Sequence, residues 1–295
     1  MKAISVAGAS IGLISAEAGI AIGRDSATAQ FLTDVTEPDV ALRASWQTNL
    51  SNDAAEYRFQ AGGIWDLAQT EAGYRFRFFA SNRGTSPYKE VALDRAFSKG
   101  VITLHREYFP PDALVDPLDF PFDELLLIHH LASRGGILVH ACGLIADGVT
   151  GCLFVGHSGA GKTTTASLWQ GRAEHQILSD DRIALRSTRD GIMMYGTPWH
   201  GTGRMASPAS APLGAVFLLE RGDESRLEPM VGAEAIAALL ARCFIPYHDV
   251  DAAMSAIALL EQVAASVPTF RFPFRPDRTA VQAVEDWIAH NNGRG

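Results

Sequence analysis

The chain has 295 residues, of which 47% are hydrophobic and 20% charged, and its formal net charge is -8. This composition is ordinary for a globular protein that is large enough to bury its own core, and the acidic balance argues against nucleic acid as the main partner. The three cysteines, Cys142, Cys152 and Cys243, are too sparse for a disulfide framework or a CxxC metal pair. We therefore expect a reduced, cytoplasmic setting. No apolar run approaches the length of a transmembrane helix, so no membrane partner is expected either.

The chain up to about residue 110 has the pattern of short β-strands. Residues 1–19 carry one lysine, and Ser and Gly interrupt their apolar stretch, so we expect a first strand there rather than a signal peptide. Residues 57–69 and 74–78 alternate between apolar and polar side chains, with turn residues at 71–73 and 81–84. The region carries no recognisable catalytic signature.

Four prolines between residues 110 and 121 break the pattern, and we place the boundary there, between a β-rich region of residues 1–110 and a second domain of residues 111–295. Strands and helices mix in the second domain, which predicts an α/β fold. We expect helices over residues 122–134, 164–169, 233–244, 252–265 and 278–290, and strands over residues 137–145, 151–155, 177–185, 192–195, 213–219 and 269–274.

The most specific motif is GHSGAGKT at residues 156–163, which matches G-x-x-x-x-G-K-[ST] in full. An apolar strand pattern precedes it and a helix-compatible run follows, which is the order that a phosphate-binding loop requires. Glycines let the backbone N–H groups turn inward, and the following helix N-terminus attracts phosphate. Lys162 is expected to contact the β- and γ-phosphates of ATP, and Thr163 to bind Mg²⁺. The predicted nucleotide-binding residues are Gly156, His157, Ser158, Gly159, Ala160, Gly161, Lys162, Thr163 and Thr164.

Two adjacent carboxylates, Asp180 and Asp181, follow an apolar strand pattern. Phosphoryl transfer needs a carboxylate near Mg²⁺ and a group that accepts the proton of the attacking hydroxyl. We expect the pair to divide these two roles, and the sequence leaves open which residue takes which. The alternative is a solvated pair at the end of a strand.

Other candidates are His140, in an apolar strand pattern, and the Gly-rich segment of residues 195–204. A histidine in such a place is either a hydrogen-bonded core residue or a catalytic group. In the segment, His200 and Arg204 are candidates for contact with the substrate, and an ordinary surface loop is the alternative.

Together, His140, the loop that opens at Gly156 and the acidic pair resemble the catalytic domain of HPr kinase/phosphorylase, whose fold is shared with phosphoenolpyruvate carboxykinase. The resemblance covers about residues 122–220 and implies a mixed sheet rather than a doubly wound one. It also implies that Lys162 acts on the nucleotide, that one of Asp180 and Asp181 is the base toward a seryl hydroxyl, and that His140 lies near that pair. A homo-oligomer is a further implication of the family.

The segment of residues 195–204 stands where true HPr kinases carry a glycine-rich signature after the acidic pair. The chain thus looks more like the HPr-kinase-like proteins whose acceptor is a serine of a peptide or small molecule, with residues 1–110 as a candidate docking region. Three hypotheses follow from the sequence: an ATP-dependent hydroxyl kinase, a regulatory or adaptor module that binds nucleotide without transfer, and a carboxykinase-type enzyme. The third needs further metal ligands and a set of oxyanion-binding arginines that the sequence does not reveal.

Overall fold

The structure is a computed structural model that describes residues 1–292 except 24, 49, 51–56, 81–85 and 173. The chain divides into two compact units, Met1–His130 and Leu131–Gly295, whereas the sequence places the boundary at residue 110. The difference arises at helix α1 (Phe122–Ala132), whose first residue packs against the sheet of the first unit. The ring of Phe122 lies edge-on to Phe76 and Phe78, with centroid distances of 6.3 and 5.8 Å.

The first unit is built on one mixed sheet. Its strands are β1 (Lys2–Val6), β2 (Ala9–Ile14), β3 (Leu32–Asp34), β4 (Val40–Gln47), β5 (Tyr57–Ala61), β6 (Trp65–Gln69), β7 (Gly73–Phe78), β8 (Lys89–Asp94) and β9 (Lys99–His105). Their order is β3-β1-β2-β4-β9-β8-β7-β6-β5, and β4 runs parallel to both β2 and β9. The expected first strand and β-rich region are confirmed, and the turn predicted at residues 81–84 lies outside the described residues.

Strand β7 shows how this sheet buries polar groups as well as apolar ones. Its Phe76 and Phe78 are fully buried, as the alternating pattern predicts. Arg77 between them is buried too, because its Nε and Nη2 donate hydrogen bonds of 3.1 and 3.0 Å to the carboxylate of Asp66 on β6. A buried arginine needs such a partner to offset the loss of water.

The second unit combines strands β10 (Gly136–Ala146), β11 (Thr150–Val155), β12 (Gln176–Ser179), β13 (Arg182–Thr188), β14 (Gly191–Gly196), β15 (Ser210–Arg221), β16 (Glu228–Met230), β17 (Cys243–Phe244) and β18 (Thr269–Phe274) with helices α2 (Lys162–Trp169), α3 (Gly232–Leu240), α4 (Val250–Ser266) and α5 (Arg278–Asn292). The strand order is β11-β10-β13-β14-β15-β18-β16, and β12 and β17 also pair with β10. Strand β15 runs parallel to β11 and β18, while β10 is antiparallel to its partners. A mixed α+β architecture with a mixed sheet is thus confirmed.

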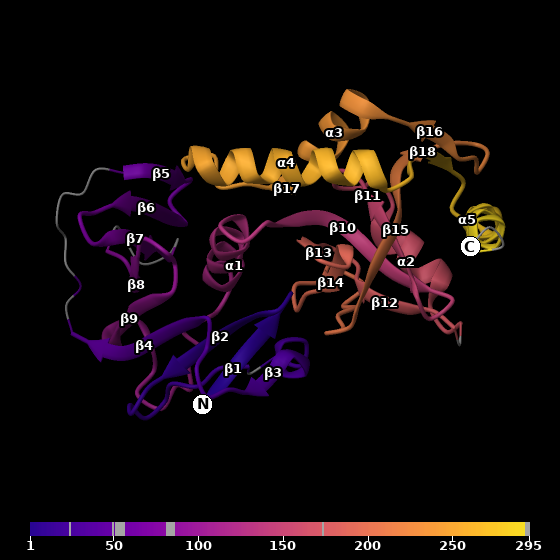
Figure 1. Ribbon diagram of the computed structural model, residues 1–295. Coiled ribbons are helices and arrows are strands. Elements are labelled where there is room, and N and C mark those ends of the chain that lie inside the picture. The colour runs from indigo at the N-terminus through magenta and orange to yellow at the C-terminus, as the bar shows by residue number, and fades with distance from the viewer. Residues whose placement is uncertain (24, 49, 51–56, 81–85, 173, 293–295) are drawn as a thin grey trace. The chain divides into compact units, whose positions relative to one another are not determined.

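Side chains alternate between two cores along the central strands. One core joins Val139, Leu153 and Val216 to apolar residues of α3 and α4, and the other joins Phe154 and Phe217 to residues of α2 and α5. Figure 1 shows α4 along one side of this sheet and α2 and α5 on the other. Because β11, β15 and β18 are parallel, their carboxyl ends meet at one edge, where the sequence places the glycine-rich loop.

Two predicted elements are wrong in extent. The strand predicted over residues 177–185 is divided into β12 and β13, and the helix predicted over residues 233–244 ends at Leu240. The strand breaks because the Ser179 hydroxyl oxygen accepts hydrogen bonds of 3.1 Å from the backbone N–H groups of Asp181 and Arg182. The helix stops because residues 243–244 pair with β10 as the short strand β17.

Among the helices of the described residues, we find no segment with the length and apolar character needed to cross a bilayer.

Candidate functional site

The glycine-rich loop joins strand β11 to helix α2 as the motif requires. Strand β11 ends at Val155 and α2 begins at Lys162. Gly159 and Gly161 have φ angles of +79° and +109°, which L-residues with a side chain rarely adopt. A Cβ atom on Gly161 would lie 2.6 Å from Cζ of Phe274, at the end of β18, so this position also needs glycine for space. The exposed His157 and Ser158 occupy the outer part of the loop.

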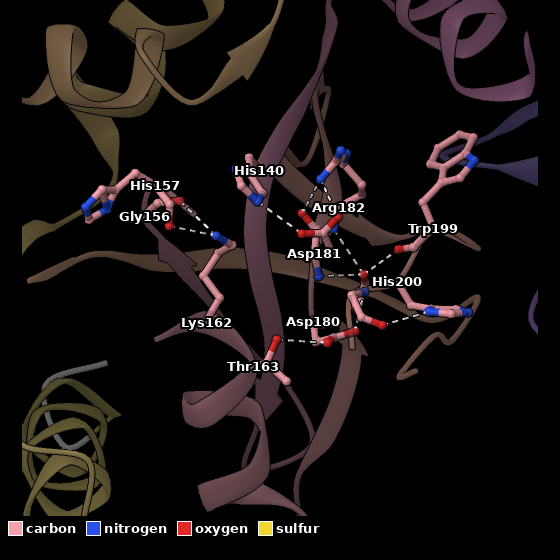
Figure 2. A network of polar contacts seen from close by, with 12 residues as sticks. His140, Gly156, His157, Lys162, Thr163, Asp180, Asp181, Arg182, Trp199 and His200 are labelled. Carbon is pink, nitrogen blue, oxygen red and sulfur yellow. Dashed lines mark hydrogen bonds and ion pairs between the residues drawn. The ribbon is translucent and has the colours of Figure 1, made fainter. Parts of the chain in front are cut away.

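Lys162 turns its side chain back over this loop. Its Nζ donates hydrogen bonds of 3.0 and 3.1 Å to the carbonyl oxygens of Gly156 and His157 (Figure 2). Burial lowers the pKa of Lys162, and the charge of Asp181 partly offsets that effect. The ammonium thus lies against the glycine-rich loop and has one donor beyond the two that the loop carbonyls occupy.

The acidic pair points in two directions from the break between β12 and β13. Asp180 is buried and faces the start of α2, where the hydroxyl of Thr163 donates a 3.1 Å hydrogen bond to its Oδ2. Asp181 faces His140 on β10 instead (Figure 2). The two neighbours therefore serve different parts of the site, because the break between β12 and β13 turns their side chains in different directions.

Backbone amides surround the carboxylate of Asp180. Gly201 donates to Oδ1 at 2.9 Å, Gly203 to Oδ2 at 2.9 Å and Met205 to Oδ1 at 3.4 Å. All three belong to the connection between β14 and β15, which folds over the end of β12. The segment that the sequence marks as rich in Gly is therefore part of the site, through its backbone.

Asp181 is held by the side chains of His140 and Arg182. Nε2 of His140 lies 3.0 Å from its Oδ1, and the guanidinium of Arg182 forms an ion pair with its Oδ2. Burial alone would raise the pKa of Asp181, but the hydrogen bond from His140 and the charges of Arg182 and Lys162 together lower it. Its carboxylate is therefore ionised at neutral pH and oriented by its neighbours.

His140 and Arg182 are fixed by the short strand β17. The backbone N–H of His140 donates a 2.8 Å hydrogen bond to the carbonyl of Arg242, next to β17. The guanidinium of Arg182 lies 4.4 Å from the ring centroid of Phe244, within the range of a cation–π contact. The structure therefore brings His140 into contact with Asp181, which lies 41 residues away in the sequence.

His200 and Arg204 differ in their surroundings. Nδ1 of His200 lies 3.0 Å from the carbonyl oxygen of Gly201, so the ring is tied to its own loop. Arg204 has a positive φ of 53° and an exposed side chain, and among the described residues its guanidinium forms no hydrogen bond or ion pair. Of the two, Arg204 has a charge that is available to a ligand.

A cavity of about 540 Å³ opens beside the glycine-rich loop. It is lined by residues 157–159 of the loop, by residues 218–221 at the end of β15 and by Arg242. Arg242 donates from Nη1 to the carbonyl of Ala238 at 3.0 Å, which fixes its side chain at the cavity. Arg221 and Arg242 thus add two cations to a site that already holds Lys162.

Sequence reasoning missed both arginines. Arg242 fell inside the helix predicted over residues 233–244, so nothing marked it as a site residue. Arg221 follows an apolar strand pattern, and its place at the carboxyl end of a strand parallel to β11 was the one available signal.

Among the described residues, no group of three or more His, Cys, Asp or Glu side chains could by itself hold a metal ion. The pair of Thr163 and Asp180 does fit Mg²⁺, because this ion is usually held by one or two side chains together with substrate phosphates. Comparison of the chain with protein-family models and with curated proteins finds no match.

Proposed function

We propose that the chain is an ATP-dependent kinase that transfers the γ-phosphoryl group to a hydroxyl, most simply a serine of a peptide, protein or small molecule. One observation carries the proposal: the two neighbouring carboxylates contact different groups. Asp180 accepts a hydrogen bond from Thr163 of the glycine-rich loop, whereas Asp181 contacts His140. A module that only binds nucleotide needs the first arrangement and has no use for the second. The resemblance to HPr kinase/phosphorylase supports the same assignment.

The loop, Lys162 and the cavity are assigned to ATP. The triphosphate lies along the turn of residues 156–163, at the N-terminus of α2, where backbone N–H groups attract phosphate. Lys162 exchanges its bonds to the carbonyls of Gly156 and His157 for the β- and γ-phosphate oxygens. Arg242, at the cavity next to the loop, adds a second cation that can balance the phosphate charge.

Thr163 and Asp180 are assigned to Mg²⁺. The hydroxyl oxygen of Thr163 and the carboxylate of Asp180 would hold the ion beside the phosphates. When bound, Mg²⁺ neutralises charge on the phosphate oxygens and favours the departure of ADP.

Asp181 is assigned to the acceptor. The hydroxyl oxygen of the acceptor attacks the γ-phosphorus, the bond between that phosphorus and the β–γ bridging oxygen breaks, and the hydroxyl proton passes to Asp181. The lowered pKa makes Asp181 a weak base, which suits a loose transition state in which the hydroxyl is mainly oriented and loses its proton late. His140 keeps the carboxylate in place, and Arg204 is the exposed cation that can meet a charged acceptor.

The alternative is a regulatory or adaptor module that binds nucleotide without transfer. The ion pair between Arg182 and Asp181 favours it, because a carboxylate engaged on both oxygens has reduced capacity to accept a proton. Lys162, which is bound to its own loop, is equally consistent with a resting state. The two functions differ in one result, the fate of the γ-phosphate.

The test is transfer of label from γ-labelled ATP, with Mg²⁺, by the full chain to serine-bearing acceptors: a set of peptides, free serine and HPr. The proposal predicts label in at least one acceptor and its loss in Lys162→Ala, since this variant lacks the ammonium that contacts the γ-phosphate. Arg189→Ala, in the exposed hairpin turn between β13 and β14, is the matched control and should behave like the parent. Transfer that survives in Lys162→Ala would exclude the mechanism.

A further inference from the structure

The connection of residues 197–209 surrounds the carboxylate of Asp180 with hydrogen-bond donors. A carboxylate has about four acceptor positions, two on each oxygen. In the structure they are occupied by the N–H groups of Gly201, Gly203 and Met205 and by the hydroxyl of Thr163. Asp180 is 1% exposed, so water does not compete with these donors.

The four donors differ in how easily they can break their hydrogen bonds to Asp180. The three amides are fixed by the backbone, whereas the hydroxyl of Thr163 can rotate about its own bond. When the hydroxyl turns its hydrogen away from Asp180, one acceptor position on Oδ2 becomes free, and a lone pair of the Thr163 oxygen faces the same space. A cation can then take the place of the hydroxyl proton between Thr163 and Asp180 without any change in the backbone.

Glycine is required at two positions of this connection because the backbone passes so close to the carboxylate. A Cβ atom on Gly201 would lie 2.8 Å from Oδ2 of Asp180, and one on Gly203 would lie 2.7 Å from it. The same atom on Gly203 would lie 3.0 Å from Cγ2 of Thr163. A methyl group at either position therefore displaces the carboxylate from Thr163. Thr202 between them is exposed and carries no such constraint.

The connection is also anchored to β12 on the other side of Asp180. The hydroxyl of Ser179 donates a 2.8 Å hydrogen bond to the carbonyl oxygen of Trp199, and the N–H of Ser207 donates to the carbonyl of Leu178 at 2.9 Å. Ser179 and Ala206 form an isolated bridge. Residues 199–207 are thus fixed at both ends to β12, the strand that ends immediately before Asp180.

We propose that residues 201–205 form a backbone cradle that positions Asp180 for a divalent cation, with Gly201 and Gly203 as positioning residues. The inference rests on the proposed function, because it assigns the cation to the site of Thr163 and Asp180. It goes further in assigning the metal-linked part of nucleotide affinity to a segment that contributes backbone rather than ligands. Such outer partners of a metal ligand typically change metal affinity by about 10- to 100-fold when they are altered.

The test measures the dissociation constant of ATP for the full chain by titration calorimetry, once in EDTA and once in excess Mg²⁺. The constant in EDTA divided by the constant in Mg²⁺ measures the coupling between metal and nucleotide. The cradle predicts a ratio well above one for the parent, which falls by about 10-fold or more in Gly203→Ala and in Gly201→Ala. It also predicts that the constant in EDTA stays at the parent value in both variants, because Lys162 and its loop are untouched.

Thr202→Ala is the matched control, an alanine between the two glycines, and it should keep the parent ratio. An unchanged dissociation constant in EDTA distinguishes a displaced carboxylate from a misfolded chain. A misfolded chain would bind ATP weakly under both conditions. A parent-like ratio in both glycine variants would overturn the cradle, and so would a parent ratio of one. Failure of the proposed function shows as absence of ATP binding or of label transfer in the parent, whereas failure of the cradle alone shows in the ratio of the two constants while the parent still binds ATP and transfers the label.

Discussion

Asp181 stands between the imidazole of His140 and the guanidinium of Arg182, and these contacts determine how its charge contributes to stability. Its pKa is lowered in the folded chain, since its partners outweigh the opposing effect of burial. A lowered pKa means that the ionised carboxylate stabilises the folded state at neutral pH. That contribution is lost as the pH falls through the folded-state pKa, below the usual value for Asp of about 4.

We therefore expect the difference in free energy of unfolding between the parent and Asp181→Asn to shrink on acidification. The measurement is urea denaturation of both chains at neutral pH and at several values below about pH 4. Asp190→Asn, in the exposed turn between β13 and β14, is the control and should show a small difference at every pH. A difference for Asp181→Asn that is constant with pH would contradict the contacts of Asp181 with His140 and Arg182.

At the scale of single residues, the sequence predicts which residues belong to the candidate site better than it predicts where their side chains point. Lys162 and Thr163 are predicted from a motif whose chemistry depends on spacing along one loop, and in the structure they begin α2, with Thr163 in contact with Asp180. The direction of each aspartate could not be predicted, because it depends on a strand break that Ser179 creates through two hydrogen bonds. The site arginines were missed because their positions depend on strand pairing rather than on local sequence.

At the scale of elements, helix α4 covers one face of the central sheet, and its N-terminus has a defined cap. The carboxylate of Asp249 accepts a 3.0 Å hydrogen bond from the N–H of Ala252. An aspartate that caps a helix in this way typically contributes about 1 kcal/mol. Asp251, in the first turn of the same helix, is exposed and interacts mainly with the helix dipole.

We expect Asp249→Ala to lower the free energy of unfolding by about 1 kcal/mol, measured by denaturant titration at neutral pH. Asp251→Ala removes the same charge from the same helix end and should cost only a few tenths of that amount. Equal losses in the two variants would show that charge, rather than the capping hydrogen bond, accounts for the effect.

Elements with a regular period were predicted well, and elements set by distant partners were not. Helix α4 and strand β18 follow their sequence patterns to within a few residues, because each has one apolar face and clear end signals. Residues 243–244 continue a helical pattern, yet they form β17, since β10 offers them an unpaired edge at Leu138 and Val139. Tertiary pairing of this kind overrides local preference.

At the scale of the whole molecule, the chain divides into two compact units, and the candidate site lies entirely in the second. The β-rich character of the first unit was predictable from alternation, but the position of the division was not. The prolines near residue 110 mark a change in the chain, whereas α1 follows the aromatic residues of β7 and stays with the first unit. The first unit remains a candidate for docking of the acceptor.

The different roles proposed for Asp180 and Asp181 are tested by comparing Asp180→Asn with Asp181→Asn. Both the Mg²⁺-linked affinity for ATP and the rate of label transfer to the acceptor are measured for each full-length variant. We predict that Asp181→Asn keeps the metal-linked affinity and loses about a hundredfold or more in rate, as for removal of a catalytic base. Asp180→Asn is predicted to lose the metal-linked affinity itself. Identical profiles for the two variants, or transfer at the parent rate in Asp181→Asn, would contradict the assignment.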